Sequence, residues 1–139
     1  MTFPFISAIT AGLLLILQLL LAFAVSGARG RRNVWVGDGG QDALLRAIRR
    51  HGNVAENAGV FVAGFTLLEL SRVAPRLLPV LCAAFVVARL AHAVGLSQAD
   101  TGNAFRLLGG VGTYLTGLAL GGALVWAGYS AAIAARATG

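Results

Sequence analysis

One segment of the chain places charged and polar residues at helical spacing. From residue 46 it reads Arg-Ala-Ile-Arg-Arg-His-Gly-Asn-Val-Ala-Glu-Asn. The residues that recur every three or four positions are Arg46, Arg49, Asn53 and Glu56. This spacing puts their side chains on one stripe along about three turns of an α-helix. Because an apolar run begins almost directly after Glu56, the pattern predicts a polar stripe that enters an otherwise apolar helix.

Further basic groups fall at matching positions later in the chain. Arg89 and His92 lie three residues apart in an apolar stretch, and therefore on one helical face. Arg106 stands near the start of the last apolar stretch. In an antiparallel bundle these groups reach a similar depth at one end, where Glu56 faces several arginines. Charge at such a depth usually faces the bundle interior or a cavity, and arginine donates paired hydrogen bonds to carboxylates. We therefore expect a pocket for an anionic ligand.

A structural role for the same residues is the alternative. Glu56 would then form a buried ion pair with Arg49 or Arg89, and Asn53 and His92 would donate hydrogen bonds between helices. Metal binding is not expected, because the histidines and glutamates of the chain lack a ligand spacing such as HxxxH.

The composition indicates that membrane-spanning helices hold these residues. Of the 139 residues, 58% are apolar and 12% are charged, and the mean hydropathy is +0.80. A soluble domain usually carries about 25% charged residues, and a disordered chain is far less hydrophobic, so neither class fits. A stretch of about 20 apolar residues spans a bilayer. We expect one all-α membrane domain over residues 1–139, a bundle of four transmembrane helices at about 3–25, 41–71, 76–96 and 104–134.

The basic residues predict how the bundle sits in the membrane. All 11 are arginines, which against 5 acids gives a net charge of +6. Most of them lie in or beside the first and third connections. We expect the first connection to be a polar loop over residues 26–42. The positive-inside rule places these two connections in the cytoplasm and both termini outside. We expect a multi-pass protein of a bacterial inner membrane, with contact to anionic lipid and no nucleic-acid partner.

The last apolar stretch carries small residues at every fourth position, namely Gly109, Thr113, Gly117 and Gly121. Residues at this spacing share one face of a helix. Small residues allow helices to approach closely in a membrane. The stripe therefore predicts close packing, either within the bundle or between subunits.

Together these features resemble the MAPEG family, the membrane-associated proteins in eicosanoid and glutathione metabolism. The resemblance covers nearly the whole chain, with four spans and a long basic first connection. It rests on an R-x-x-x-N-x-x-E signature in the second helix, an R-x-x-H pair in the third and an arginine at the start of the fourth. The residues that carry it are Arg46, Arg49, Asn53, Glu56, Arg89, His92 and Arg106.

The resemblance implies a homotrimer that binds glutathione between its subunits, near the cytoplasmic side. The arginine that matches Arg106 stabilises the glutathione thiolate in the family, so Arg106 is the expected catalytic residue. A lipophilic electrophile or lipid hydroperoxide would reach the sulfur from the lipid. The implied activity is a detoxifying membrane glutathione transferase or peroxidase with glutathione as co-substrate. The residues expected to hold glutathione are Arg46, Arg49, Asn53, Glu56, Arg89 and His92.

Three positions depart from the family pattern. Several eukaryotic members have a tyrosine at the position of Leu96, members similar to prostaglandin E synthase have an arginine at that of Gly52, and a serine can occupy that of Leu107. Prostaglandin synthesis is therefore not expected. Two other functions stay open: a non-catalytic membrane scaffold or lipid-binding trimer, and a small proton-coupled transporter that uses Glu56 and His92.

Overall fold

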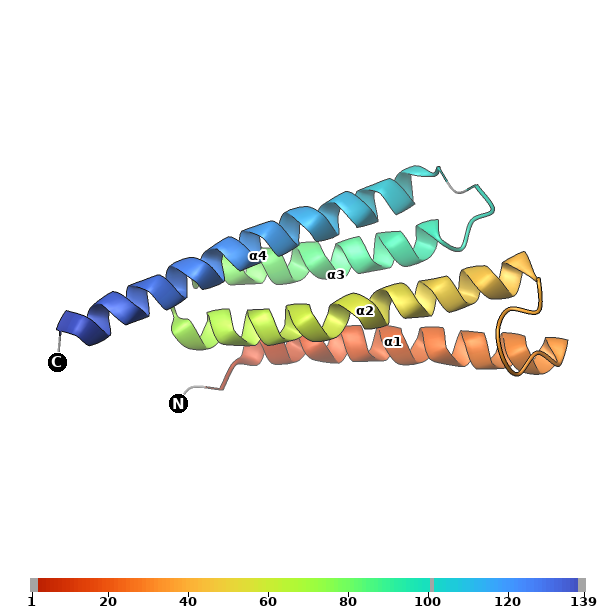
Figure 1. Cartoon of the computed structure of the whole chain (residues 1–139), viewed down its shortest axis with the longest axis horizontal. Helices are drawn as coiled ribbons and strands as arrows, with labels where there is room; N and C mark the ends of the chain where they lie inside the picture. The colour runs from red at the N-terminus through yellow and green to blue at the C-terminus, as the bar shows by residue number, and fades with distance from the viewer. Residues whose placement is uncertain (1–2, 101, 138–139) are drawn as a thin grey trace.

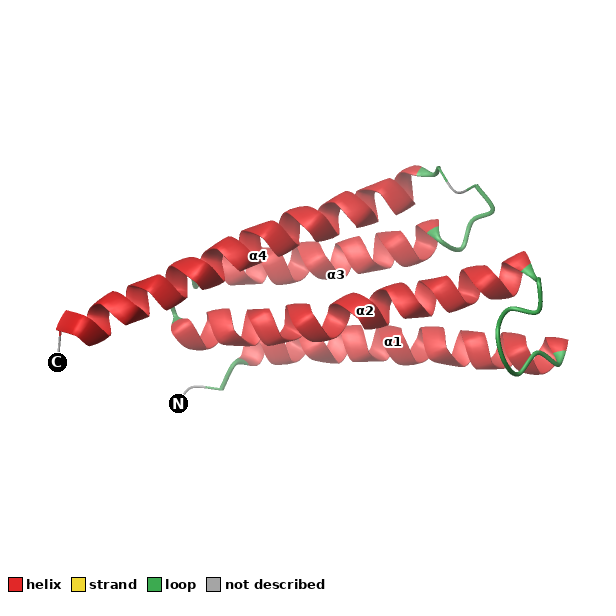
Figure 2. Ribbon diagram, viewed as in Figure 1, coloured by secondary structure: helices red, strands yellow, loops and turns green. Residues whose placement is uncertain are grey.

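A computed structural model describes residues 3–100 and 102–137, which form an antiparallel bundle of four helices (Figures 1 and 2). Each helix is long and apolar enough to cross a membrane. The two ends of the chain lie at one end of the bundle, and the α1–α2 and α3–α4 connections lie at the other (Figure 1). The structure confirms the predicted all-α bundle. Its helices are α1 Phe5–Arg32, α2 Asp42–Ser71, α3 Leu77–Gly95 and α4 Ala104–Ala137.

α1 is longer than the sequence predicts. The predicted helix ended near residue 25 and a polar loop followed, but the helix continues to Arg32. The loss of hydropathy does not stop a helix, and alanine and arginine are good helix formers. The helix ends where Asn33 adopts the left-handed conformation, with φ of 52°, and its N–H bonds to the carbonyls of Arg29 and Gly30. The arginines predicted in a loop thus lie in the last turn of α1. There, their positive charges interact favourably with the negative end of the helix dipole.

The bundle consists of two hairpins, because contacts are densest between α3 and α4 and between α1 and α2. The α3–α4 hairpin depends on two glycines: Gly95 lies against the backbone of Arg106, and Gly109 lies against that of His92. A Cβ atom at Gly109 would lie 2.5 Å from the backbone nitrogen of His92. Ordinary carbon contacts are about 3.5–4.0 Å, so only glycine fits. These two contacts fix the register of the hairpin at the level of His92 and Arg106.

The small-residue stripe of α4 lies mainly against the chain's own helices. Gly109 contacts α3, and Thr113 is buried. A Cβ atom at Gly117 would lie 3.1 Å from the ring of Phe61 on α2. A Cβ atom at Gly121 would meet nothing within 4 Å. Packing within the bundle therefore accounts for the first three members of the stripe.

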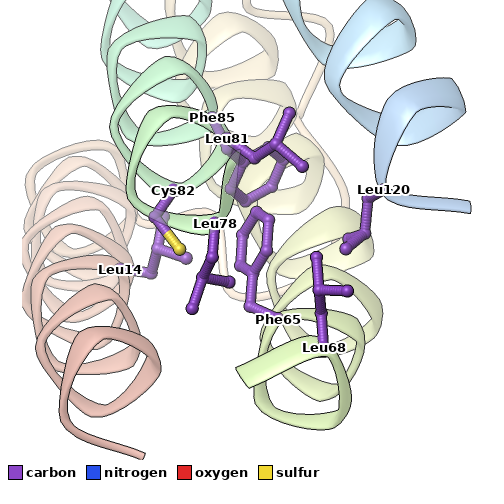
Figure 3. Close-up of a cluster of buried hydrophobic side chains, with 8 residues drawn as sticks. All are labelled: Leu14, Phe65, Leu68, Leu78, Leu81, Cys82, Phe85 and Leu120. Atoms are coloured by element: carbon purple, nitrogen blue, oxygen red, sulfur yellow. The ribbon is translucent and has the colours of Figure 1, made fainter. Parts of the chain in front are cut away.

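An apolar core fills the half of the bundle nearer the termini. All four helices contribute to it, and its side chains converge in Figure 3. The ring of Phe61 stacks on that of Phe85 with centroids 3.8 Å apart, and Phe65 meets Phe85 edge-on. A second, smaller apolar cluster of Leu21, Val54 and Ala93 lies nearer the connections. The buried members of the apolar core shown in Figure 3 are Leu14, Phe65, Leu68, Leu78, Leu81, Cys82, Phe85 and Leu120.

Candidate functional site

A polar pocket of about 220 Å³ opens where the two hairpins meet, in the half of the bundle near the connections. One wall is the polar stripe of α2, and the other combines the end of α3 with the start of α4. The structure therefore brings together most of the residues that the sequence singles out. The residues that line the pocket are Ile48, Arg49, Gly52, Asn53, Glu56, His92, Leu96 and Arg106.

A second pocket of about 200 Å³ adjoins the first, and the two share Arg49, Leu96 and Arg106 in their walls. The second pocket adds Arg46, which lies one turn nearer the α1–α2 connection than Arg49. Arg49, Glu56 and Arg106 are exposed, and Arg46 is half-buried. Three guanidinium groups and one carboxylate thus line a continuous polar region, which makes it positively charged and open to an anionic ligand.

Arg89 lies behind the pocket wall and not in it. Its side chain is 1% exposed. The guanidinium donates hydrogen bonds to Oδ1 of Asn53 on α2 at 2.5 Å, to the carbonyl of Gly109 on α4 at 3.1 Å, and to the hydroxyl of Thr113. A buried charge needs such partners to offset its lost hydration. Arg89 therefore joins three helices and positions Asn53, while its predicted contact with glutathione stays a prediction.

The same contacts bear on the structural alternatives. Arg89 binds Asn53 and not Glu56, so the predicted Glu56–Arg89 ion pair is absent from the described part of the chain. Asn53 does form a hydrogen bond between helices, and it also lines the pocket. His92 lines the pocket as well, and its Nδ1 atom is buried with no partner among the described residues. Buried polar atoms are nearly always hydrogen-bonded, so this nitrogen is an exception within the pocket wall.

Two polar contacts between α1 and α2 were missed by sequence reasoning. Glu69 accepts hydrogen bonds from the backbone N–H of Ile6 at 3.0 Å, and from the N–H and hydroxyl of Ser7 at 2.8 and 2.6 Å. This carboxylate caps the positive end of α1. Gln18 and His51 share a hydrogen bond of 2.7 Å. The signal that could have found both is the presence of lone polar residues in apolar stretches of adjacent helices. These contacts hold α1 against α2 and leave the pocket to the other helices.

The fold and the pocket define a class: a multi-pass membrane protein with a cationic pocket between two helical hairpins. Among residues 3–100 and 102–137, no group of three His, Cys, Asp or Glu side chains is placed to hold a metal ion. Residues 7–126 match the MAPEG family, so the chain belongs to this family. The matched segment includes every predicted site residue. A search of curated proteins finds no match.

The three departures from the family pattern have clear places in the structure. Leu96 lines both pockets and so makes their walls more apolar than a tyrosine would. Gly52 lines the first pocket, where a Cβ atom would lie 3.8 Å from a carboxylate oxygen of Glu56. A long side chain at this position would therefore enter the pocket beside Glu56. Leu107 is 66% exposed and points away from the bundle.

Proposed function

We propose that this protein is a membrane glutathione transferase. In the reaction, the glutathione thiolate attacks an electrophilic carbon of a lipophilic substrate, a C–S bond forms and the leaving group departs. The same thiolate would give peroxidase activity, in which two glutathiones and a lipid hydroperoxide yield glutathione disulfide, the lipid alcohol and water. The observation that carries the proposal is the convergence of Arg49, Glu56, His92 and Arg106 on one pocket of a MAPEG protein.

The charges of glutathione complement those of the pocket. The tripeptide carries two carboxylates and one ammonium group. Arg46 and Arg49, one turn apart on α2, would bind carboxylates with charge-assisted hydrogen bonds. Glu56 would pair with the ammonium, and His92, which lines the same pocket, would contact the peptide backbone. Asn53, held by Arg89, would present its remaining hydrogen-bonding capacity to the ligand.

Arg106 is the proposed catalytic residue. A free thiol has a pKa of about 8.5 and is mostly protonated at neutral pH, whereas a nearby guanidinium favours the thiolate. Each unit by which the pKa falls corresponds to about 1.4 kcal/mol of preferential interaction with the thiolate. Arg106 lies in the first turn of α4, where its N–H donates to Oδ1 of Asn103 at 3.0 Å. The positive end of this helix would add to the stabilisation.

We further propose a homotrimer, with the two charged connections in the cytoplasm. Arg49, Glu56 and Arg106 are exposed in the single chain, so a neighbouring copy would close the pocket and exclude water from the thiolate. The arginines near the connections favour the cytoplasmic orientation by the positive-inside rule.

The test is a glutathione titration of the protein purified in detergent, followed by ultraviolet absorbance of the thiolate and by conjugation of chlorodinitrobenzene. We expect saturable binding, a thiolate signal at neutral pH and conjugate formation. Arg106→Ala should abolish the thiolate signal and retain much of the binding, whereas the control Arg76→Ala, at the opposite end of the bundle, should change neither. A stable protein that binds no glutathione at millimolar concentration would refute the proposal and favour a non-catalytic scaffold.

A further inference from the structure

The connection between α1 and α2, residues 33–41, folds back along α1 and does not project beyond it (Figure 1). Arg29 holds it there: its guanidinium donates hydrogen bonds to the carbonyls of Val34 at 3.2 Å and Gly37 at 2.8 Å. The N–H of Val34 in turn donates to the carbonyl of Arg29 at 3.2 Å. The first part of the connection therefore lies level with Arg29, about one turn before the end of α1.

The rest of the connection has a defined shape. Gly37, Gly39 and Gly40 all have φ between 60° and 69°, a conformation that favours glycine. A Cβ atom at Gly39 would lie 2.8 Å from the side chain of Val34, so the loop closes tightly on itself. The N–H of Gly40 also donates to the carboxylate of Asp38 at 2.9 Å. These contacts fix the part of the loop that turns outward.

The outward part of the loop is apolar. Trp35 is 78% exposed and Val36 is 89% exposed, although both lie in a connection and not on a membrane-spanning face. Arg31 and Arg32 come four and three residues before Trp35, at the end of α1; Arg31 is exposed and Arg32 is partly exposed. An exposed tryptophan close in sequence to arginines is typical of the membrane interface, where its ring lies among lipid headgroups.

The depth of the loop agrees with this placement. The apolar part of α1 ends at Val25, and Arg29 follows four residues later. At a rise of about 1.5 Å per residue, Arg29 lies about 6 Å outside the hydrocarbon core. The headgroup layer is about 5–7 Å thick on each side of a bilayer. With the hydrocarbon core taken to end at Val25, the loop that Arg29 binds at its own level falls at the depth of the headgroup layer.

We propose that the α1–α2 connection is a lipid-binding site for anionic phospholipids. Trp35 and Val36 insert into the interface, while Arg31 and Arg32 bind the phosphate groups of lipids such as phosphatidylglycerol. Charge complementarity identifies the occupant, since juxtamembrane arginines attract anionic headgroups. The site lies outside the glutathione pocket and does not depend on the proposed enzyme activity.

The test uses the fact that the chain has 2 tryptophans, Trp35 and Trp126. Trp126→Phe leaves Trp35 as the single reporter, and Trp35→Phe leaves Trp126, on the half of α4 away from the connections, as the matched control. Each variant is placed in phosphatidylcholine nanodiscs with or without phosphatidylglycerol. Fluorescence is then measured with iodide, which quenches from water, and with lipids brominated near the headgroup.

We expect phosphatidylglycerol to shift Trp35 emission to shorter wavelength, to reduce iodide quenching at least twofold and to increase quenching by the brominated lipids. Arg31→Gln combined with Arg32→Gln should remove this dependence and leave Trp126 unchanged. Equal iodide quenching of Trp35 in both lipid mixtures would overturn the proposal. Protection of Trp35 that is lost on dilution in detergent and is independent of anionic lipid would also overturn it, because the loop would then contact a second copy of the chain.

Discussion

The contact between Gly109 and His92 offers a direct test of how the site is positioned. In Gly109→Ala, the new methyl group would lie 2.5 Å from both the backbone nitrogen and the Cβ atom of His92. Backbone atoms cannot rotate away as a flexible side chain can. Contact at about 3.5–4.0 Å therefore requires α3 and α4 to separate by about 1 Å at this level. His92 and Arg106 would move apart across the pocket that both of them line.

The expected magnitudes follow from this separation. Overpacking in a tight contact costs about 1–3 kcal/mol of stability. A shift of about 1 Å in a catalytic group lowers the rate on the order of 100-fold. Gly110→Ala is the matched control, because a Cβ atom at this neighbouring position would meet nothing within 4 Å. Alanine there should maintain or raise stability, since glycine costs about 1 kcal/mol relative to alanine in a helix.

The assay combines unfolding by sodium dodecyl sulfate in mixed micelles with the rate of glutathione conjugation. We expect Gly109→Ala to unfold at lower denaturant and to lose most of its activity, while Gly110→Ala behaves like the wild type. Equal stability and activity of the two variants would show that the α3–α4 approach is not fixed by Gly109. A loss of stability with full activity would show that Gly109 supports the packing of α3 against α4 but does not determine the positions of His92 and Arg106.

Three further predictions use the same denaturant titration together with the glutathione titration. Arg89→Leu should be strongly destabilising, because it removes the donor to Asn53 and Thr113. Each buried polar group left without a partner costs about 1–3 kcal/mol of stability. Wild-type stability in this variant would contradict the role assigned to the buried guanidinium. Glu69→Ala should cost about 0.5–2 kcal/mol through loss of the α1 cap without changing glutathione affinity. Glu56→Ala should do the opposite, weakening glutathione binding and leaving stability near that of the wild type, and a reversal of these two outcomes would refute the division between capping and binding carboxylates.

Local features of the sequence predicted much of the fold and most of the pocket. Hydropathy over about 20 residues marks a span, and the spacing of three and four residues correctly placed Arg49, Asn53 and Glu56 on one wall of the pocket. The end of α1 was predicted wrongly because hydropathy reports where the membrane ends, whereas the helix ends at the backbone cap of Asn33.

Contacts between helices distant in sequence could not be predicted in the same way. Periodicity places Arg89 and His92 on one face of α3, but it does not say that Arg89 lies behind the pocket wall while His92 lines it. That difference depends on the acceptors that α2 and α4 bring to the guanidinium. The cap of α1 by Glu69 joins residues 62 and 63 positions apart, beyond any local pattern.

Because the walls of the pocket come from both hairpins, neither hairpin can bind the ligand by itself. Membrane helices insert first and associate afterwards, so the pocket forms only once the two hairpins have docked. A ligand that binds the docked form alone favours docking by about 2.7 kcal/mol at a hundredfold excess over its Kd. A ligand of this pocket would therefore raise, by mass action, the fraction of inserted chains in which the two hairpins are docked.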